Sequence, residues 1–549
     1  MTDQLDAFKL VANPLDREFA GTVIRIPLRT QNQAKTSEIS NVAVSPEELL
    51  AFFESFQVDV AESLVFMRNI ERVTFSINGE ELGTTTLLHI AQVRKARSAV
   101  SSAVLTMTPH SGAVRYVISQ KYKHDACSVE STRIYQVQQT IFDMHTQVPS
   151  DLITWALESK AFPWVTLAAR LDEGSPSRES RIFVTLPLPG TLDNTCVNIH
   201  GIFALKRDRR SLWTDDDSKG GTQLKEIDWN NFLFKVVIPI AWNRLLVELT
   251  RQGCVRVADY FPLMSASPGS IWLTLTKDVL NEVLNERSKI WYSTTDLFLP
   301  LEEGYLVDEA QDTTFIDVFQ RVSMPLFKQV PDQILRLLSN SSHTYTTVNP
   351  ASVCNWLRRR DQQTKAPLLV VSDAMCLLQY ICRRGELEQL YDISVFLCCD
   401  GQLRPLSLRP VTAEIASFDS QFYIGTDEER NLFNERGDLF LSLDTYPSLV
   451  STQIRDRLPE LSKTLNLERF GLREFKKFCA DRLFSPLRLQ HPEIIEMSEF
   501  GIQFEWIQKL WCWLDQKPLT EVSKAVDLEW LIPLHDGKAL FLVLYTSRP

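Results

Sequence analysis

A chain of 549 residues is too long for a single hydrophobic core, and its length predicts three or four domains. Its net charge of −11 argues against a nucleic-acid partner, because such binding depends on clustered cations that neutralise phosphates. No apolar run reaches the roughly 20 residues of a membrane span, and the start lacks a signal peptide. The sequence therefore predicts a soluble, cytoplasmic protein, although local basic patches such as 358–360 stay possible.

The first predicted element is a strand over residues 20–30, AGTVIRIPLRT, which is entered through Gly21 and Thr22. A helix is predicted to begin at Pro46, because Ser45 is a typical N-cap and Glu48 completes a capping box. A strand at 72–77 (RVTFSI) follows, ending in the hairpin signal Asn78-Gly79.

From there to about residue 205 the pattern is nearly all strands. They are VLTM (104–107), VRYVISQKYK (114–123), RIYQVQQTIF (133–142), WVTLAARL (164–171), RIFVTLPL (181–188) and VNIHGIFAL (197–205). DEGSPSRES (172–180) is interpreted as a hairpin loop. We expect an antiparallel sheet with one or two long helices, which is an α+β domain.

The last of these strands leads into a basic turn at 206–210, KRDRR, which is closed by Trp213. Apolar and polar residues alternate from Val197, which predicts a half-buried strand with His200 as a packed or edge residue. Arg209 and Arg210 lie where a scaffold can present fixed cations to a phosphate or a carboxylate. The residues by themselves favour the alternative, in which these arginines cap a helix or form surface ion pairs.

After the acidic run TDDDSKGGT (214–222), interpreted as a mobile loop, the hydrophobic period changes from two to about 3.6. Asp228 is the predicted N-cap of a helix over FLFKVVIPIAWNRLLVELTRQG, which Gly253 closes. Helical patterns continue at 270–292, 315–322 and 331–342, so residues 226–345 are predicted to be mainly helical.

In residues 346–549 a unit of a helix and a β-hairpin is predicted to occur twice. The copies pass through the Asp-Gly turns Asp400-Gly401 and Asp536-Gly537, each between two apolar strands. Tryptophans on helices are interpreted first as core residues, and exposed ones would mark a partner surface. They are Trp242, Trp356, Trp506, Trp511 and Trp513.

The sequence contains no common catalytic arrangement. It has no Walker A loop and no GxGxxG, GxSxG, HExxH or kinase motif, and its eight histidines are scattered singly. The ten cysteines follow no zinc spacing and are interpreted as buried, reduced residues. No catalytic residue, metal ligand or cofactor is therefore predicted.

Several segments, taken in order, resemble the family of large proteins with sacsin-repeat regions. The resemblance covers most of the chain and is looser in the C-terminal third. The segments are GTVIRIPLRT and SEIS (21–30, 37–40), SPEELLAFFESF and VFMRNIERVTF (45–56, 65–75), VNIHGIFALKRDRRSLW (197–213), WNNFLFKVVIPIAWNRLL (229–246), DISVFLCCDGQLRPLSL (392–408) and FYIGTDEERNLF (422–433).

In that family each repeat opens with a Bergerat-type nucleotide-binding domain, similar to that of the large ATP-dependent heat-shock chaperone. The resemblance implies that residues 1–30 are a remnant of its last strand, with Gly21 and Thr22 near the adenine. The diagnostic Glu/Asn helix and DxGxG loop are missing from the sequence. ATP and Mg²⁺ would therefore bind only together with a separately supplied domain.

The same resemblance implies that residues 31–225 form a middle-type domain, followed by a mainly helical domain (226–345) and an α+β region (346–549). In the chaperone a middle-domain arginine reaches the γ-phosphate, and Arg209 or Arg210 is the candidate here.

Three hypotheses follow. The leading one is a non-enzymatic, sacsin-like scaffold with a chaperone-type role, whose partners are client proteins or chaperone machinery. The second is that the chain completes an ATPase in trans by supplying Arg209 or Arg210 to a separate Bergerat domain. The third is a truncated fragment without independent function. The sequence predicts neither the clients nor the oligomeric state.

Overall fold

The chain divides into two compact units, residues 1–290 with 330–341 and residues 291–329 with 342–549. The computed structural model describes residues 29–38, 41–77, 80–124, 127–171, 179–193, 195–217, 224–263, 271–307, 313–328, 330–340, 343, 345–362, 369–383, 387–409, 417–478, 494–496, 503–525, 529–533 and 538–543.

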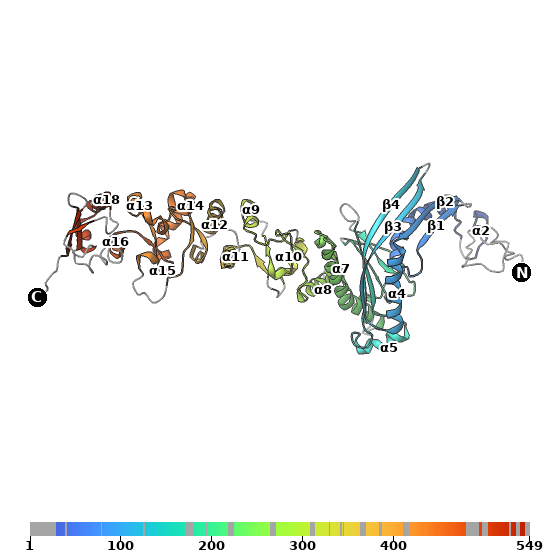
Figure 1. The fold of residues 1–549 in the computed structure, drawn as a ribbon. Coiled ribbons are helices and arrows are strands. Elements are labelled where there is room, and N and C mark those ends of the chain that lie inside the picture. Colours follow the sequence, from blue (N-terminus) through green and yellow to red (C-terminus); the bar gives the residue numbers. More distant parts are fainter. Residues whose placement is uncertain are drawn as a thin grey trace. The chain divides into compact units, whose positions relative to one another are not determined.

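An eight-stranded sheet is the centre of the first unit, in the order β1-β2-β3-β4-β5-β10-β7-β8 (Figure 1). Its neighbours pair antiparallel except β10 and β7, which are parallel. The expected α+β class, with a mostly antiparallel sheet, is confirmed. The strands are β1 (Arg72–Ile77), β2 (Glu80–Leu88), β3 (His110–His124), β4 (Cys127–Ile141), β5 (Trp164–Arg170), β7 (Ile182–Val184), β8 (Leu186–Pro187) and β10 (Val197–Gly201), with β6 (Glu179–Ser180) and β9 (Leu192–Asp193) forming a separate pair.

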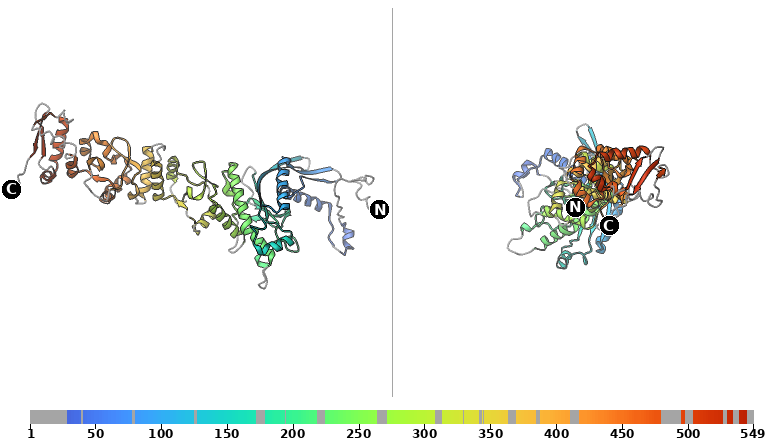
Figure 2. Two further views of the ribbon diagram at one scale, coloured as in Figure 1. Left: turned by 60° about the horizontal axis from the view of Figure 1, so that its bottom comes forward. Right: turned by 90° about the vertical axis from the view of Figure 1, so that its left-hand side faces the viewer.

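Helices cover both faces of this sheet (Figure 1, Figure 2). α3 (Pro46–Phe66) and α4 (Ile90–Thr106) pack on one face, where Leu64 and Val93 share a core cluster with Tyr116 and Tyr135. Side chains alternate along a strand, so the buried Gln136 lies on the opposite face, beneath α7 (Ile238–Arg251). The other helices of this unit are α2 (Gln31–Lys35), α5 (Ser150–Glu158), α6 (Lys225–Phe232), α8 (Ile271–Asn285) and α10 (Asp332–Ser339).

Local signals place several of these elements as predicted. The Ser45 Oγ accepts a hydrogen bond from the Glu48 N–H at 3.2 Å, and the Glu48 carboxylate accepts one from the Ser45 N–H at 2.8 Å. The helix therefore begins at Pro46, as expected. β1 and β2 form the predicted hairpin, whose Asn78-Gly79 turn lies outside the described residues.

Two predictions in this part of the chain were wrong. Residues 104–107, predicted as a strand, lie at the end of α4, because Val93, Arg97, Val100 and Ala103 are buried at helical spacing. A four-residue apolar run carries too little periodicity to distinguish the two. α5 was also missed in a region that was predicted to be nearly all strands.

A continuous helical run, α6, a π-helical segment (Leu233–Val237) and α7, crosses the second face of the sheet. Pro239 lacks the N–H that would bond to the Lys235 carbonyl, which accounts for a π-turn at this point. The run begins at Lys225, so the predicted N-cap Asp228 lies inside a helix and that assignment was wrong. It ends before Gly253 (φ +77°), as predicted.

The second unit consists of short helices and small sheets around two core clusters. Its elements are β11 (Trp291–Tyr292), β12 (Phe298–Leu299), β13 (Tyr305–Leu306), α9 (Thr313–Arg321), β14 (Thr346–Thr347), α11 (Pro350–Gln362), α12 (Val371–Arg383), β15 (Ser394–Leu397), β16 (Leu403–Pro405), β17 (Phe422–Ile424), α13 (Asp427–Leu432), α14 (Ser448–Asp456), α15 (Leu458–Thr464), β18 (Leu467–Arg469), α16 (Leu472–Phe478), β19 (Ile494–Glu496), α18 (Phe504–Asp515), α19 (Leu519–Ala525), β20 (Glu529–Pro533) and β21 (Lys538–Val543).

The repeated unit is confirmed in its element order. α11 and α12 precede the β15–β16 hairpin, and α18 and α19 precede the β20–β21 hairpin. Gly401 has φ +81°, which a glycine adopts without strain in the first turn. The Asp536-Gly537 turn lies outside the described residues, and β19 adds a third strand to the second copy.

Two expectations about residue types were corrected, those for the cysteines and for residues 358–360. None of the tryptophans whose side chains the structure describes is exposed, which agrees with their interpretation as core residues. Cys399 and Cys512 are exposed rather than buried. The run 358–360 is not a free basic patch: Arg358 lies over the Tyr391 ring at 3.8 Å and bonds to the Gln389 carbonyl.

Candidate functional site

The strand that leads to the basic turn is more buried than predicted. All five residues of β10 are buried, because the strand lies between β5 and β7 and helices cover both faces of the sheet. It ends at Gly201, where an added Cβ would lie 2.9 Å from the Phe203 ring. The prediction of a half-buried strand that continues to Leu205 was therefore wrong.

Residues 205–212 form a tight turn. Leu205 and Leu212 pair across it, and the Lys206 N–H bonds to the Ser211 carbonyl at 2.9 Å. Arg209 has φ +57°, and the Asp208 carboxylate accepts a hydrogen bond from the Arg210 N–H at 2.9 Å. The turn is thus held by its own backbone and one aspartate.

Arg209 and Arg210 are exposed at this turn. Within the described ranges, neither forms an ion pair with a carboxylate or caps a helix end. Gly21 and Thr22, the other two candidates, lie outside the described residues. Of the four predicted residues, Arg209 and Arg210 are thus the two within the described ranges.

The acidic segment after the turn is partly fixed in place. The Lys206 ammonium lies 2.6 Å from the Asp217 carboxylate, and this bond lowers the pKa of Asp217. Asp217 also accepts a hydrogen bond from the Thr214 N–H at 2.9 Å. The prediction of a mobile loop was wrong for residues 214–217, and 218–222 lie outside the described residues.

Asn230 on α6, which the sequence reading missed, ties both arms of the turn to the helix. Its Nδ2 donates to the carbonyls of Ala204 and Trp213, each at 2.9 Å, and its Oδ1 accepts from the Ala204 N–H at 2.8 Å. Asn230 is buried. The available signal for this anchor was an asparagine inside an amphipathic helix, because a buried side-chain amide needs hydrogen-bond partners.

We expect Asn230→Ala to loosen the turn and to lower stability by about 2 kcal/mol, because it removes three hydrogen bonds and leaves the part-buried Ala204 N–H and Trp213 carbonyl without their side-chain partner. Hydrogen exchange of the 204–213 amides measures this directly. Asn231→Ala is the matched control, since among the described residues the Asn231 side chain bonds only to the exposed Asp215. Equal exchange in both variants would show that Asn230 does not anchor the turn.

His200 is packed inside the sheet, as predicted. Its ring lies 5.4 Å from that of Phe66 and 5.1 Å from that of Trp164, and its Nδ1 lies 3.1 Å from the Phe183 carbonyl oxygen. Burial lowers the pKa of His200 to about 4, and the charge of Arg68 adds to this effect. The imidazole is therefore neutral at pH 7.

The depressed pKa of His200 predicts a loss of stability in mild acid. The unfolded state takes up the proton near pH 6.5 while the folded state does not, so stability falls as pH drops from 6.5 toward 4. The loss should be about 1.4 kcal/mol at pH 5.5 relative to pH 7.5. Urea unfolding at the two pH values measures it, and His200→Gln should flatten the difference; an unchanged slope would contradict the assignment.

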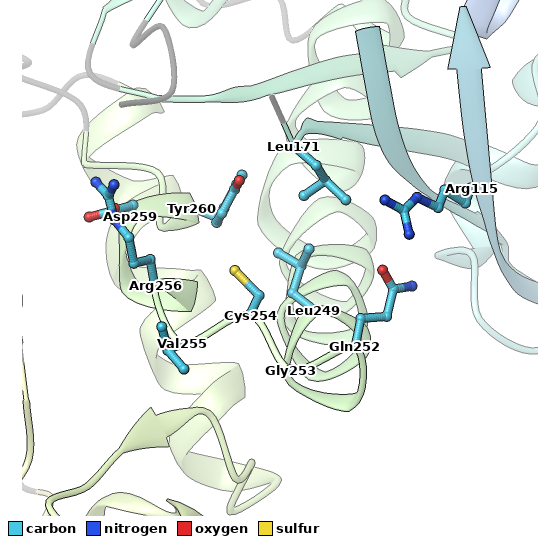
Figure 3. Close-up of a pocket in the computed structure, with 10 residues that line it drawn as sticks. All are labelled: Arg115, Leu171, Leu249, Gln252, Gly253, Cys254, Val255, Arg256, Asp259 and Tyr260. Atoms are coloured by element: carbon cyan, nitrogen blue, oxygen red, sulfur yellow. The ribbon is translucent and has the colours of Figure 1, made fainter. Parts of the chain in front are cut away.

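A second candidate is a pocket of about 400 Å³ at the end of α7 (Figure 3). Arg115 and Gln252 line one side of it, and Cys254 and Tyr260 the other. Burial raises the pKa of the Cys254 thiol, and Arg256 holds the Asp259 carboxylate at 2.6 Å. This arrangement offers an exposed cation but no activated nucleophile.

Across the residues that the structure describes, no three His, Cys, Asp or Glu side chains gather as a metal site would require. In this part of the chain, none of the helices combines the length and apolarity needed to cross a membrane.

Comparison with known proteins gives two matches. Residues 1–89 match the model of the Sacsin domain family. The chain is 24% identical to human sacsin, over 83% of this chain and 10% of sacsin. It thus spans about a tenth of the length of that relative. No solved structure matches the chain. Together these matches identify the chain as a sacsin-like protein.

Proposed function

We propose that the chain is a non-enzymatic scaffold with a chaperone-type role, which presents protein-binding surfaces in the cytoplasm. Its partners are client proteins or chaperone machinery. The similarity to sacsin along most of the chain supports this role. The missing Bergerat motifs support the absence of ATPase activity in the chain by itself, and no cofactor is proposed.

The observation that carries the proposal is an exposed apolar cluster around the start of α3. Phe52 is 59% exposed and stacks on Phe56 at 5.9 Å, and Leu50 and Val44 are also exposed. Contiguous apolar side chains on a surface are typical of protein-binding sites. The first two turns of α3 thus offer an aromatic surface to unfolded or partner segments.

Light scattering of heat-denatured citrate synthase, with and without the full chain, tests this role. We expect the chain to suppress aggregation and Phe52→Glu to remove at least half of the effect. Leu519→Glu is the control, because Leu519 is 83% exposed outside the cluster. No suppression by the full chain would overturn the proposal, as would micromolar binding of ATP and Mg²⁺ with measurable turnover in calorimetry.

A second function is favoured by the exposed, fixed position of Arg209 and Arg210. We propose that they stabilise phosphate charge when a separate Bergerat domain binds ATP and Mg²⁺, because guanidinium groups neutralise such charge. Mixing such a domain with the chain should raise turnover at least tenfold. Arg209→Ala with Arg210→Ala should abolish the gain, whereas Lys289→Ala with Lys463→Ala should keep it. No loss in the arginine double variant would end this idea.

A further inference from the structure

β3 has a partner on both sides along only part of its length. All of its residues pair with β4, but β2 pairs only with residues 117–122. β2 ends at Leu88 and the chain turns directly into α4 at Ile90, so no described strand pairs with residues 110–116 on that side. This free edge of seven residues, at roughly 3.4 Å each, is about 24 Å long.

α4 packs against β3 (Figure 1). Residues of both elements line a groove of about 420 Å³ at the free edge. Val93 and Val100 of α4 are buried, so a different stripe of this helix faces the groove. That stripe includes Ala96 and Ala99, and the strand side includes Gly112 and Ala113. These small side chains leave room for a second backbone beside the edge.

The charge in this groove has one sign. Lys95 and Arg115 line it and are exposed, and the groove has no carboxylate among its lining residues. Neither cation forms an ion pair in the part of the chain that the structure describes. Burial lowers the pKa of His110, which is therefore neutral at pH 7. The groove is thus locally positive in a chain whose net charge is −11.

We propose that residues 110–116 bind an extended, acidic peptide segment of a partner protein as an added β-strand. The partner's backbone would bond to the free N–H and C=O groups of β3. Its acidic side chains would pair with Lys95 on the α4 face of the sheet and with Arg115 on the opposite face, where Arg115 lies across from Gln136. The inference rests on the proposed scaffold role, for which it names one class of partner. A chain that binds the peptide but suppresses no aggregation would leave this site intact and remove only the chaperone role.

The test uses a fluorescein-labelled nine-residue peptide in which pairs of glutamates alternate with pairs of valines, so that acidic side chains lie on both faces of the added strand. It is titrated with the full chain by fluorescence anisotropy. We expect micromolar binding that weakens at least tenfold in Lys95→Glu with Arg115→Glu. The control, Lys289→Glu with Lys463→Glu, makes the same charge change at exposed lysines elsewhere and should stay within twofold. Equal weakening in both double variants would mean non-specific charge attraction and would overturn the proposal.

Two further measurements test the strand geometry. N-methylation of one alternate set of peptide amides should abolish binding and the other set should not, because only one edge of the added strand faces β3. The amides of residues 110–116 should exchange more slowly when the peptide is bound. Equal binding by both methylated peptides would exclude strand addition. Self-association of the chain that the peptide reverses would instead make a second copy the occupant of this edge.

Discussion

Trp242→Ala is expected to destabilise the first unit by about 4 kcal/mol. The indole is fully buried on α7, where the helix packs on the sheet, and its Nε1 donates to the Tyr260 carbonyl at 2.8 Å. Truncation leaves a cavity in a close-packed layer and strands that carbonyl.

Trp242→Phe separates the two contributions to this effect. It keeps most of the volume and removes the hydrogen bond, so we expect a loss of about 1–2 kcal/mol. Urea unfolding followed by hydrogen exchange at β5 reports on the first unit without interference from the second. A loss below about 1 kcal/mol in the alanine variant would show that this layer repacks around the missing ring.

Arg97→Ala is expected to cost about 3 kcal/mol. This buried guanidinium on α4 donates to the Leu64 carbonyl at 2.7 Å and to the Ile70 carbonyl at 3.0 Å, and lies 5.8 Å from the Tyr116 ring centroid. Leu64 belongs to the last turn of α3, whose carbonyls have no partner within the helix. Arg97 of α4 thus supplies a hydrogen-bond donor to a carbonyl at the end of α3.

Arg94→Ala is the matched control for this prediction. Arg94 lies one turn earlier on the same helix, is 67% exposed and pairs with Glu71 at 2.6 Å. An exposed ion pair contributes at most about 1 kcal/mol. Thermal unfolding of both variants should therefore show a much larger shift for Arg97, and similar shifts would mean that the buried contacts add nothing.

The sequence predicted that the candidate arginines are exposed. It did not predict the hydrogen bonds that anchor their turn. A run of charged residues after an apolar strand predicts a turn, and Arg209 and Arg210 lie in one. Asn230 reaches this turn from 26 residues away through three hydrogen bonds. No spacing rule links an asparagine on a helix to two backbone segments that only the fold brings to it.

The sequence by itself determined the features that depend on a few neighbouring residues. The start of α3 at Ser45, the end of α7 before Gly253 and the hairpin at Gly401 each follow from a cap bond or a positive φ. Only the tertiary structure decided that residues 104–107 are helical, that β10 is buried on both faces and that β3 has a free edge at 110–116. These features depend on which elements pack together. Long-range packing overrides local periodicity, because it buries apolar surface that no single segment can remove from water by itself.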